Sequence, residues 1–381
     1  MREIGRLALN VTIIGLLGRT YSIVDQIFAS KISPEHLHAH VLISYIPFFA
    51  TTTGIIFGYT LLVLFAKSKN DQEINQLLTG SLAVAISLIF LPFSLLHLFA
   101  KSIIVFLNLE TVSGSELYLK LQVVASVFLV ITTIFKYALI SSKSGKTVII
   151  ADVFGNIFNM MGNWVSITFL LEPSNKFQGI VISTLLAQTV VVFIYFQLYR
   201  NRLVAHIYSS ARTYLTRARS ILLGEAGNMY LLYFFPLLIT ELLRVYGKDS
   251  QVTGYNIGYQ LGYFLNMPGI ALGIAGANWA AEVVNQSFAC YKERISTIHK
   301  TALLFAVFPS LVLLPFVKAV SATIYGITDI FAVFSIACCI VGVALSGALV
   351  SYTCVARSVE EPKFLARIEI LSSYFVGIPF L

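Results

Sequence analysis

The chain has 381 residues, of which 57% are hydrophobic and only 12% are charged, and its mean hydropathy is +0.83. Charged residues make up about a quarter of a soluble globular domain, so this composition excludes that class. The apolar runs are about twice as long as the strands of a membrane β-barrel, which excludes barrels as well. Because only helices and closed barrels satisfy the backbone in lipid, we expect an all-α polytopic membrane protein.

Long apolar segments follow one another along the chain, and eleven are expected. Most are long enough to cross a bilayer of about 30 Å as a helix. The longest connection, residues 201–219, is basic and is expected to be a linker that joins two lobes, residues 1–207 and residues 208–381. The segments are expected at residues 4–29, 38–66, 76–99, 115–141, 147–171, 178–200, 219–245, 252–285, 297–319, 328–356 and 364–381.

Lys and Arg are distributed unevenly between the two sides of the membrane that these segments define. The side that holds the N-terminus carries 17 of them and the other side carries 6. Positive residues accumulate in cytoplasmic loops, so the N-terminus is predicted to be cytoplasmic, in a multi-pass protein of the cell inner membrane. This asymmetry accounts for the net charge of +8, and nucleic acid is not expected as a partner.

The two halves of the chain resemble each other. Residues 40–66 match residues 255–281 at an offset of 215, which pairs Gly54 with Gly269 and Gly58 with Gly273. Each Gly-x-x-x-Gly pair would let a neighbouring helix approach closely. Because the copies lie six segments apart, they run in the same direction and predict two six-helix bundles related by a parallel pseudo-two-fold repeat. The chain ends at Leu381 within an apolar segment, so we expect the second bundle to be incomplete, with the twelfth helix missing.

The first segment, Ile4 to Phe28, carries an acid, Asp25, near its outer end. A carboxylate at mid-bilayer costs roughly 2.5–3.5 kcal/mol on insertion scales and less near an interface. Such residues persist mainly where they face a bundle interior or a watery cavity. Asp25 is therefore predicted to handle H⁺ or Na⁺; the alternative is an acid that lies among lipid headgroups without a role.

Four uncharged polar residues could complete an ion site. Asn159 and Asn163 share one face of the fifth segment, and Thr184 and Gln188 share one face of the sixth. Their amide and hydroxyl oxygens are ligands that a hard cation accepts. The alternative for all four is ordinary hydrogen bonding between helices. The coupling ion is the only cofactor expected, and no metal site is predicted.

The start of the second half is unusually rich in tyrosine. Tyrosines that line a cavity can hold flat or cationic organic molecules through stacking and cation–π contacts. Packing in the core or against lipid is the alternative. The residues assigned to a substrate cavity on this basis are Tyr233, Tyr255, Tyr259, Tyr263 and Asn266, together with Arg19.

Several charged or titratable side chains within or beside the segments need partners. Arg19 lies six residues before Asp25, about 240° around the helix, so the two do not share a face. It is expected to pair within the structure or to bind an anionic group of a substrate. Glu241 and Arg244 are expected to form an i,i+3 ion pair, and Lys136 is expected to reach the cytoplasmic interface. The alternating histidines, taken as a solvated helix start rather than a metal or pH-sensing site, are His36, His38 and His40.

Four stretches resemble the multidrug and toxic compound extrusion (MATE) family of secondary transporters, in its prokaryotic branch. They are Val24 to Phe28, Gly155 to Asn163, Gly254 to Ile257 with Met267 to Gly273, and Tyr374 to Phe380. The resemblance implies twelve helices in two lobes, a central cavity, and export driven by inward movement of H⁺ or Na⁺. Asn163 stands where the family often has an aspartate, so Asp25 is the one acid that the resemblance carries over.

The resemblance and the buried acid together predict an ion-coupled antiporter that exports small organic molecules by alternating access, as a monomer in the lipid bilayer. A flippase of lipid-linked precursors and a non-transporting, degenerate relative are the alternatives. An integral membrane enzyme would need a histidine or acid pair at one depth. His97, His206 and His299 are scattered, so no enzyme is expected.

Overall fold

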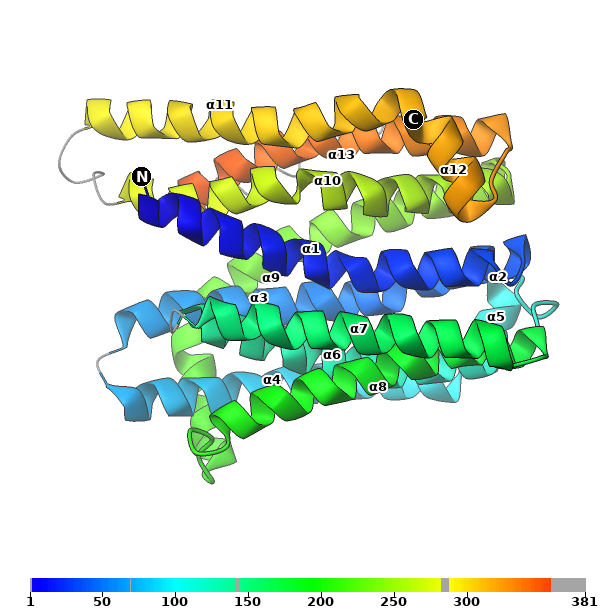
Figure 1. Cartoon of the computed structure of the whole chain (residues 1–381). Coiled ribbons are helices and arrows are strands. Elements are labelled where there is room, and N and C mark those ends of the chain that lie inside the picture. Colours follow the sequence, from blue (N-terminus) through cyan, green and yellow to red (C-terminus); the bar gives the residue numbers. More distant parts are fainter. Residues whose placement is uncertain (1, 69, 142–143, 282–287, 358–381) are drawn as a thin grey trace. The chain divides into compact units, whose positions relative to one another are not determined.

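The computed structural model describes residues 2–68, 70–141, 144–281 and 288–357, and every regular element in them is a helix (Figure 1). The chain forms two compact units. The α10 unit contains the residues up to Ile27 together with those from Phe234 onward, and the α6 unit spans Phe28–Tyr233. The lobe boundary expected between residues 207 and 208 stays a prediction.

The α6 unit is a bundle in which α3 packs on α6, α6 packs on α8, and α7 packs on α8. It also contains the first part of α9 (Ile207–Tyr246). Its other helices are α2 (Pro34–Ile43), α3 (Tyr45–Lys67), α4 (Asp71–Leu98), α5 (Ala100–Phe106), α6 (Ser115–Ser141), α7 (Gly145–Phe169) and α8 (Pro173–Tyr199).

The α10 unit is built on α10, which packs along α13 and also against α11. It contains most of α1 (Arg2–Ser30) and the last part of α9. Its other elements are α10 (Asp249–Ala281), α11 (Phe288–Leu313), the short 3₁₀ helix η1 (Leu314–Phe316), α12 (Val317–Tyr325) and α13 (Ile330–Arg357).

Ten of the expected segments correspond to helices, and six spans in the described residues are long and apolar enough to cross a membrane. The eleventh segment and the stretch Tyr374 to Phe380 lie outside the described residues. The second segment is divided at Ser44, because the ring of Pro47 removes the backbone hydrogen bond to Ile43. The expected linker 201–219 is wrong from Ile207 onward, where the chain is helical.

The internal repeat is confirmed by the positions of the helices. Pro34 and Asp249 begin matching helices, and Ser115 and Ile330 begin another matching pair; in both cases the offset is 215 residues. Each half thus places a short helix, α5 or α12, between its third and fourth long segments. Short apolar helices of this kind gave no separate signal in the sequence.

Glycines allow close approach where the repeat packs most tightly. A Cβ placed on Gly54 of α3 would lie 2.6 Å from Thr133 Cβ on α6. On α10, a Cβ on Gly258 would lie 2.7 Å from the backbone oxygen of Ile336 on α13. Gly269, the predicted partner of Gly54, instead approaches Ala302 of α11. The small residues therefore serve helix contact in both halves, but against different neighbours.

Candidate functional site: two polar seams

The first polar seam joins α1 to α10 within the α10 unit. Gln26, which is fully buried, donates from Nε2 to Oδ1 of Asn256 at 2.9 Å. One face of α10 supplies both Asn256 and Gln260, since they are four residues apart. In an apolar environment each such bond satisfies groups that lipid could not, so the seam fixes α1 against α10.

Arg19 extends this seam. Its Nη1 donates to Oε1 of Gln260 at 3.2 Å, and its guanidinium lies 4.8 Å from the ring centroid of Tyr263. The guanidinium is thus held by an amide oxygen and an aromatic face, both of which stabilise a cation. The expectation that Arg19 pairs within the structure is consistent with these contacts.

Asp25 follows this seam at the end of α1 and is 5% exposed. Its side chain is therefore enclosed by protein, while its role as an ion site stays a prediction. Asp25 lies in the α10 unit, whereas the other four ion-site candidates lie in the α6 unit.

The tyrosines of the predicted substrate cavity fall into two places. Tyr255, Tyr259 and Tyr263 form a ladder on α10, with ring centroids 6.2 Å and 4.7 Å apart in succession. Tyr233 belongs to the α6 unit, where its hydroxyl donates to the backbone oxygen of Tyr45 at 2.9 Å. Asn266 is buried and donates to the backbone oxygen of Val343, so its side chain is directed at α13.

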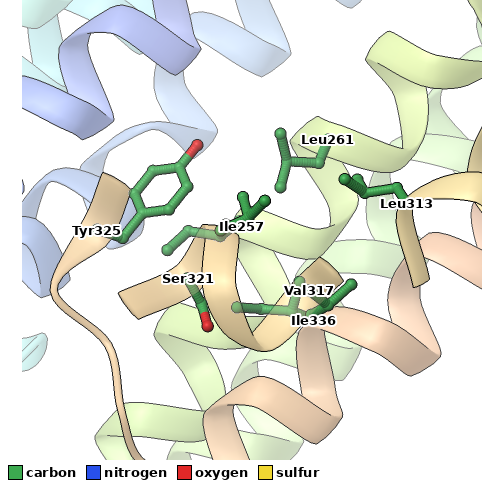
Figure 2. Close-up of a pocket in the computed structure, with 8 residues that line it drawn as sticks. Ile257, Leu261, Leu313, Val317, Ser321, Tyr325 and Ile336 are labelled. Carbon is green, nitrogen blue, oxygen red and sulfur yellow. The ribbon is translucent and has the colours of Figure 1, made fainter. Parts of the chain in front are cut away.

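Figure 2 shows a hollow in the α10 unit that these tyrosines do not line. The hollow has no room for a water molecule, and Ser321 is its only lining residue with an aliphatic hydroxyl. We therefore assign it to packing rather than to substrate. It is lined by Ile257, Leu261, Leu313, Val317, Val320, Ser321, Tyr325 and Ile336.

The second polar seam runs along α7. Its buried stripe carries Asp152, Asn159 and Asn163, each at most 1% exposed, while Phe158 and Trp164 on the same helix are exposed. The helix is thus polar inward and apolar outward, as a membrane-spanning helix of a polar bundle must be. The hydroxyl of Thr184 on α8 donates to Oδ1 of Asn159 at 3.0 Å.

Gln188 lies one turn beyond Thr184 on α8 and accepts from Thr132 of α6 at 3.4 Å. The structure therefore places Asn159, Thr184 and Gln188 on the contacts among α6, α7 and α8. Gly162 permits the approach, because a Cβ there would lie 2.5 Å from Oγ of Ser183. The predicted face-sharing of these residues is confirmed; their binding of an ion stays a prediction.

A buried ion pair at the other end of the same stripe was missed. Lys136 Nζ lies 2.9 Å from Oδ1 of Asp152, and the hydroxyl of Tyr195 lies 3.5 Å from the same oxygen. The expectation that Lys136 reaches the interface is wrong, because its side chain is only 13% exposed and faces α7. The signal was present: α6 and α7 form a hairpin, and the two charges lie at similar distances from its turn.

The histidine prediction is also wrong. His36 and His40 are buried rather than solvated. His40 Nδ1 lies 2.7 Å from the hydroxyl of Tyr118 on α6, and His36 Nε2 lies 3.3 Å from the backbone oxygen of Ser113. They dock the start of the second segment onto α6, because a helix that begins at Pro34 can turn both rings to one side.

Solved structures share this fold. No family model matches the sequence, and no curated protein matches it. An inward-facing multidrug resistance MATE family transporter of the MOP superfamily has a TM-score of 0.70 at 13% identity, covering 98% of this chain and 89% of that chain. MATE in the straight conformation gives 0.69 at 15% identity, covering 99% and 86%.

The chain has the MATE fold. A MOP superfamily transporter from Pyrococcus furiosus also matches, with a TM-score of 0.68 at 14% identity over 99% of this chain and 86% of that chain. The resemblance seen in the motifs is thus confirmed at the level of fold. In this MATE fold, the motif around Asp25 ends the first helix, and the motif from Gly155 to Asn163 forms the buried stripe of α7.

Proposed function

We propose that this chain is an ion-coupled antiporter that exports small organic molecules across a cell inner membrane by alternating access, with its N-terminus cytoplasmic. Asp25 takes up H⁺ or Na⁺ in the α10 unit, and Asn159, Asn163, Thr184 and Gln188 supply further polar ligands in the α6 unit. The observation that carries the proposal is a carboxyl group, 5% exposed, near the end of the first helix of a chain with the MATE fold.

The proposed cavity residues are those of the tyrosine ladder. The rings of Tyr255 and Tyr259 are stacked, the ring of Tyr263 is tilted against that of Tyr259, and the guanidinium of Arg19 lies over Tyr263. Such rings favour flat or cationic aromatic compounds, since every face carries partial negative charge. We expect a small cationic dye to be a suitable first substrate for assay.

The test is dye transport by the purified protein in sealed vesicles, driven separately by a pH gradient and by a Na⁺ gradient. Asp25→Asn is expected to abolish ion-driven accumulation, because an amide neither titrates nor carries charge. The matched control is Asp71→Asn, which removes an exposed acid at the start of α4 and should transport like the wild type. Dye accumulation by Asp25→Asn that equals that of the wild type would contradict the coupling role of Asp25.

A flippase of lipid-linked precursors is the second candidate, and Arg19 favours it. A guanidinium inside a membrane helix is suited to a phosphate group. The Pyrococcus furiosus relative is itself described as having a binding pocket of reverse polarity that suggests a different function. The same vesicles, loaded with a fluorescent lipid pyrophosphate, decide between the two: movement of the lipid and not of the dye identifies the flippase. Movement of neither identifies the non-transporting relative.

A further inference from the structure

The first turns of α9 carry a surface that the transport cycle does not use. The chain is helical here from Ile207 onward and belongs to the α6 unit as far as Tyr233. The stretch and the residues just before it are strongly basic. Its cations are Arg200, Arg202, Arg212, Arg217 and Arg219.

One face of this helix is fixed to the bundle. Ser210, Tyr214 and Ala218, spaced four residues apart, are each 0% exposed. The ring of Tyr214 stacks on Phe57 of α3 with centroids 6.0 Å apart and planes 17° apart. A Cβ on Gly80 of α4 would meet the backbone of Ser210, so the two helices touch directly.

Two polar contacts hold the same face in place. The backbone N–H of Val204 donates to Oγ1 of Thr79 at 3.1 Å, and Arg217 forms an ion pair with Glu73 of α4. Arg217 is therefore paired with a residue of the protein itself and is not counted among the side chains that could bind a ligand. The position of the helix is set by α3 and α4, and its opposite face is presented outward in a fixed orientation.

That opposite face combines apolar and cationic side chains. Four residues of this face follow one another at spacings of four, three and four, which places them on one side of a helix. They are Tyr208, Arg212, Leu215 and Arg219. Tyr208 is 83% exposed and Leu215 is 45% exposed, and both arginines are exposed. An apolar stripe with interleaved arginines is typical of helices that lie in a membrane interface.

The direction of the first turns of α9 is consistent with a position in the membrane interface. Figure 1 shows the first turns of α9 crossing the direction of α4 rather than running alongside it. It lies by the start of α4, since Arg217 contacts Glu73 in the first turn of that helix. The asymmetry of Lys and Arg assigns this end of the bundle to the cytoplasm.

We propose that the interfacial face of α9, formed by Tyr208, Arg212, Leu215 and Arg219, binds anionic phospholipid headgroups of the cytoplasmic leaflet. The proposal rests on the proposed orientation. Tyr208 and Leu215 enter the boundary of the acyl chains, and the two arginines reach back to the phosphates. Each arginine near an anionic surface contributes about fivefold to lipid binding, equivalent to about 1 kcal/mol.

The test measures which lipids the full-length protein retains. The purified protein is equilibrated with mixed micelles of phosphatidylglycerol and phosphatidylcholine, and the bound lipids are counted by native mass spectrometry. The wild type should be enriched in phosphatidylglycerol. The double variant Arg212→Gln/Arg219→Gln should lose up to about 25-fold of that preference, and added salt should weaken the wild type in the same direction.

Two further variants make the result specific. Lys101→Gln/Lys318→Gln removes two exposed charges from α5 and α12, on the opposite side of the membrane, and should retain the enrichment. Tyr208→Ser/Leu215→Ser should lower it, because a free phosphate site would not need apolar residues. Enrichment that survives in Arg212→Gln/Arg219→Gln, or that falls equally in the lysine control, overturns the proposal.

The orientation is tested separately, so that the two failures can be told apart. Ser209 is exposed on the same turns, and Ser209→Cys is placed in a chain whose native cysteines are replaced by serine. A membrane-impermeant maleimide added outside right-side-out vesicles should leave it unlabelled. Labelling from outside would overturn the cytoplasmic assignment, while the lipid count still decides whether the face binds anionic headgroups.

Discussion

Several buried polar and charged side chains on these helices are held by partners from neighbouring helices. Asp152 is an example. It is fully buried, one of its oxygens lies 2.9 Å from Lys136 Nζ, and its other oxygen, Oδ2, has no hydrogen-bond partner. A buried ion pair adds little net stability, but the loss of one member leaves an uncompensated charge.

This asymmetry predicts the outcome of a double-mutant cycle. Asp152→Leu should lower the free energy of unfolding by about 3–5 kcal/mol, because Lys136 then keeps a buried charge without its partner. The double variant Lys136→Met/Asp152→Leu should recover most of that loss. Thermal unfolding of the purified protein in detergent measures both. A double variant that is as unstable as the sum of the two single variants contradicts the paired role.

Contacts between side chains on one helix were predictable from the sequence, whereas contacts between side chains on different helices were not predicted. The Glu241–Arg244 pair is confirmed, with Arg244 Nε 2.9 Å from Glu241 Oε2, because helical geometry alone brings residues three apart together. Lys136 and Gln26 found partners that depend on which helices are neighbours. One sequence does not specify that α1 and α10 are neighbours, so the Gln26 contact was missed, whereas the partner of Lys136 lies on the next helix of a hairpin and its signal was overlooked.

At the scale of helices, the contact between α10 and α13 depends on the absence of side chains. A Cβ on Gly258 would lie 2.7 Å from the backbone oxygen of Ile336. Gly258→Ala should therefore destabilise the protein by about 1–3 kcal/mol, because the backbones must separate. Gly342→Ala on α13, where a Cβ meets nothing within 4 Å, should instead be neutral or stabilising by up to about 1 kcal/mol. Equal melting temperatures for the two variants would contradict this account.

The start of α13 is fixed by Asp329. Its Oδ2 accepts from Oγ of Ser250 at 2.7 Å and from the backbone N–H of Ala332 at 3.1 Å. The hydrogen bond from Ser250 lowers the pKa of the Asp329 carboxyl below its usual value. The cap thus joins the beginnings of α10 and α13, the same two helices that the glycines bring together.

A lowered pKa gives the cap a pH dependence of known sign. The stabilisation is fully present above about pH 4, the ordinary aspartate pKa, and is lost as the pH falls below it and the carboxylate is protonated. Asp329→Asn should therefore lower the melting temperature at neutral pH, and the difference from wild type should shrink at acidic pH. A difference that stays constant, measured by circular dichroism from neutral to acidic pH, would show that the ionised form is not what stabilises the cap.

At the scale of the whole molecule, the order of segments and the repeat followed from hydrophobic length and one offset. The contacts of α1 with α10 did not follow from them. The residues of α1 up to Ile27 belong to one compact unit with the second half of the chain, although the sequence places them in the first half. The hydrogen bonds of Arg19 and Gln26 to α10 are part of that grouping, and they link distant positions that have no common sequence signal.

The proposed alternating access between the two halves of the repeat predicts that this α1–α10 seam opens during each cycle. A Cβ on Gly15 would lie 3.9 Å from Cβ of Met267, which matches the separation of about 3.8 Å in disulfides. Gly15→Cys/Met267→Cys in a chain without its native cysteines should therefore transport when reduced and stop when oxidised. Dye accumulation in vesicles, with and without a reductant, measures the effect. A control bridge within the second half is Gly269→Cys/Ala306→Cys between α10 and α11, where the two Cβ atoms would lie 3.0 Å apart; it joins helices of one half and should leave accumulation unchanged on oxidation. Transport that continues with the α1–α10 bridge closed would mean that α1 stays with α10 throughout the cycle, and that the halves part elsewhere.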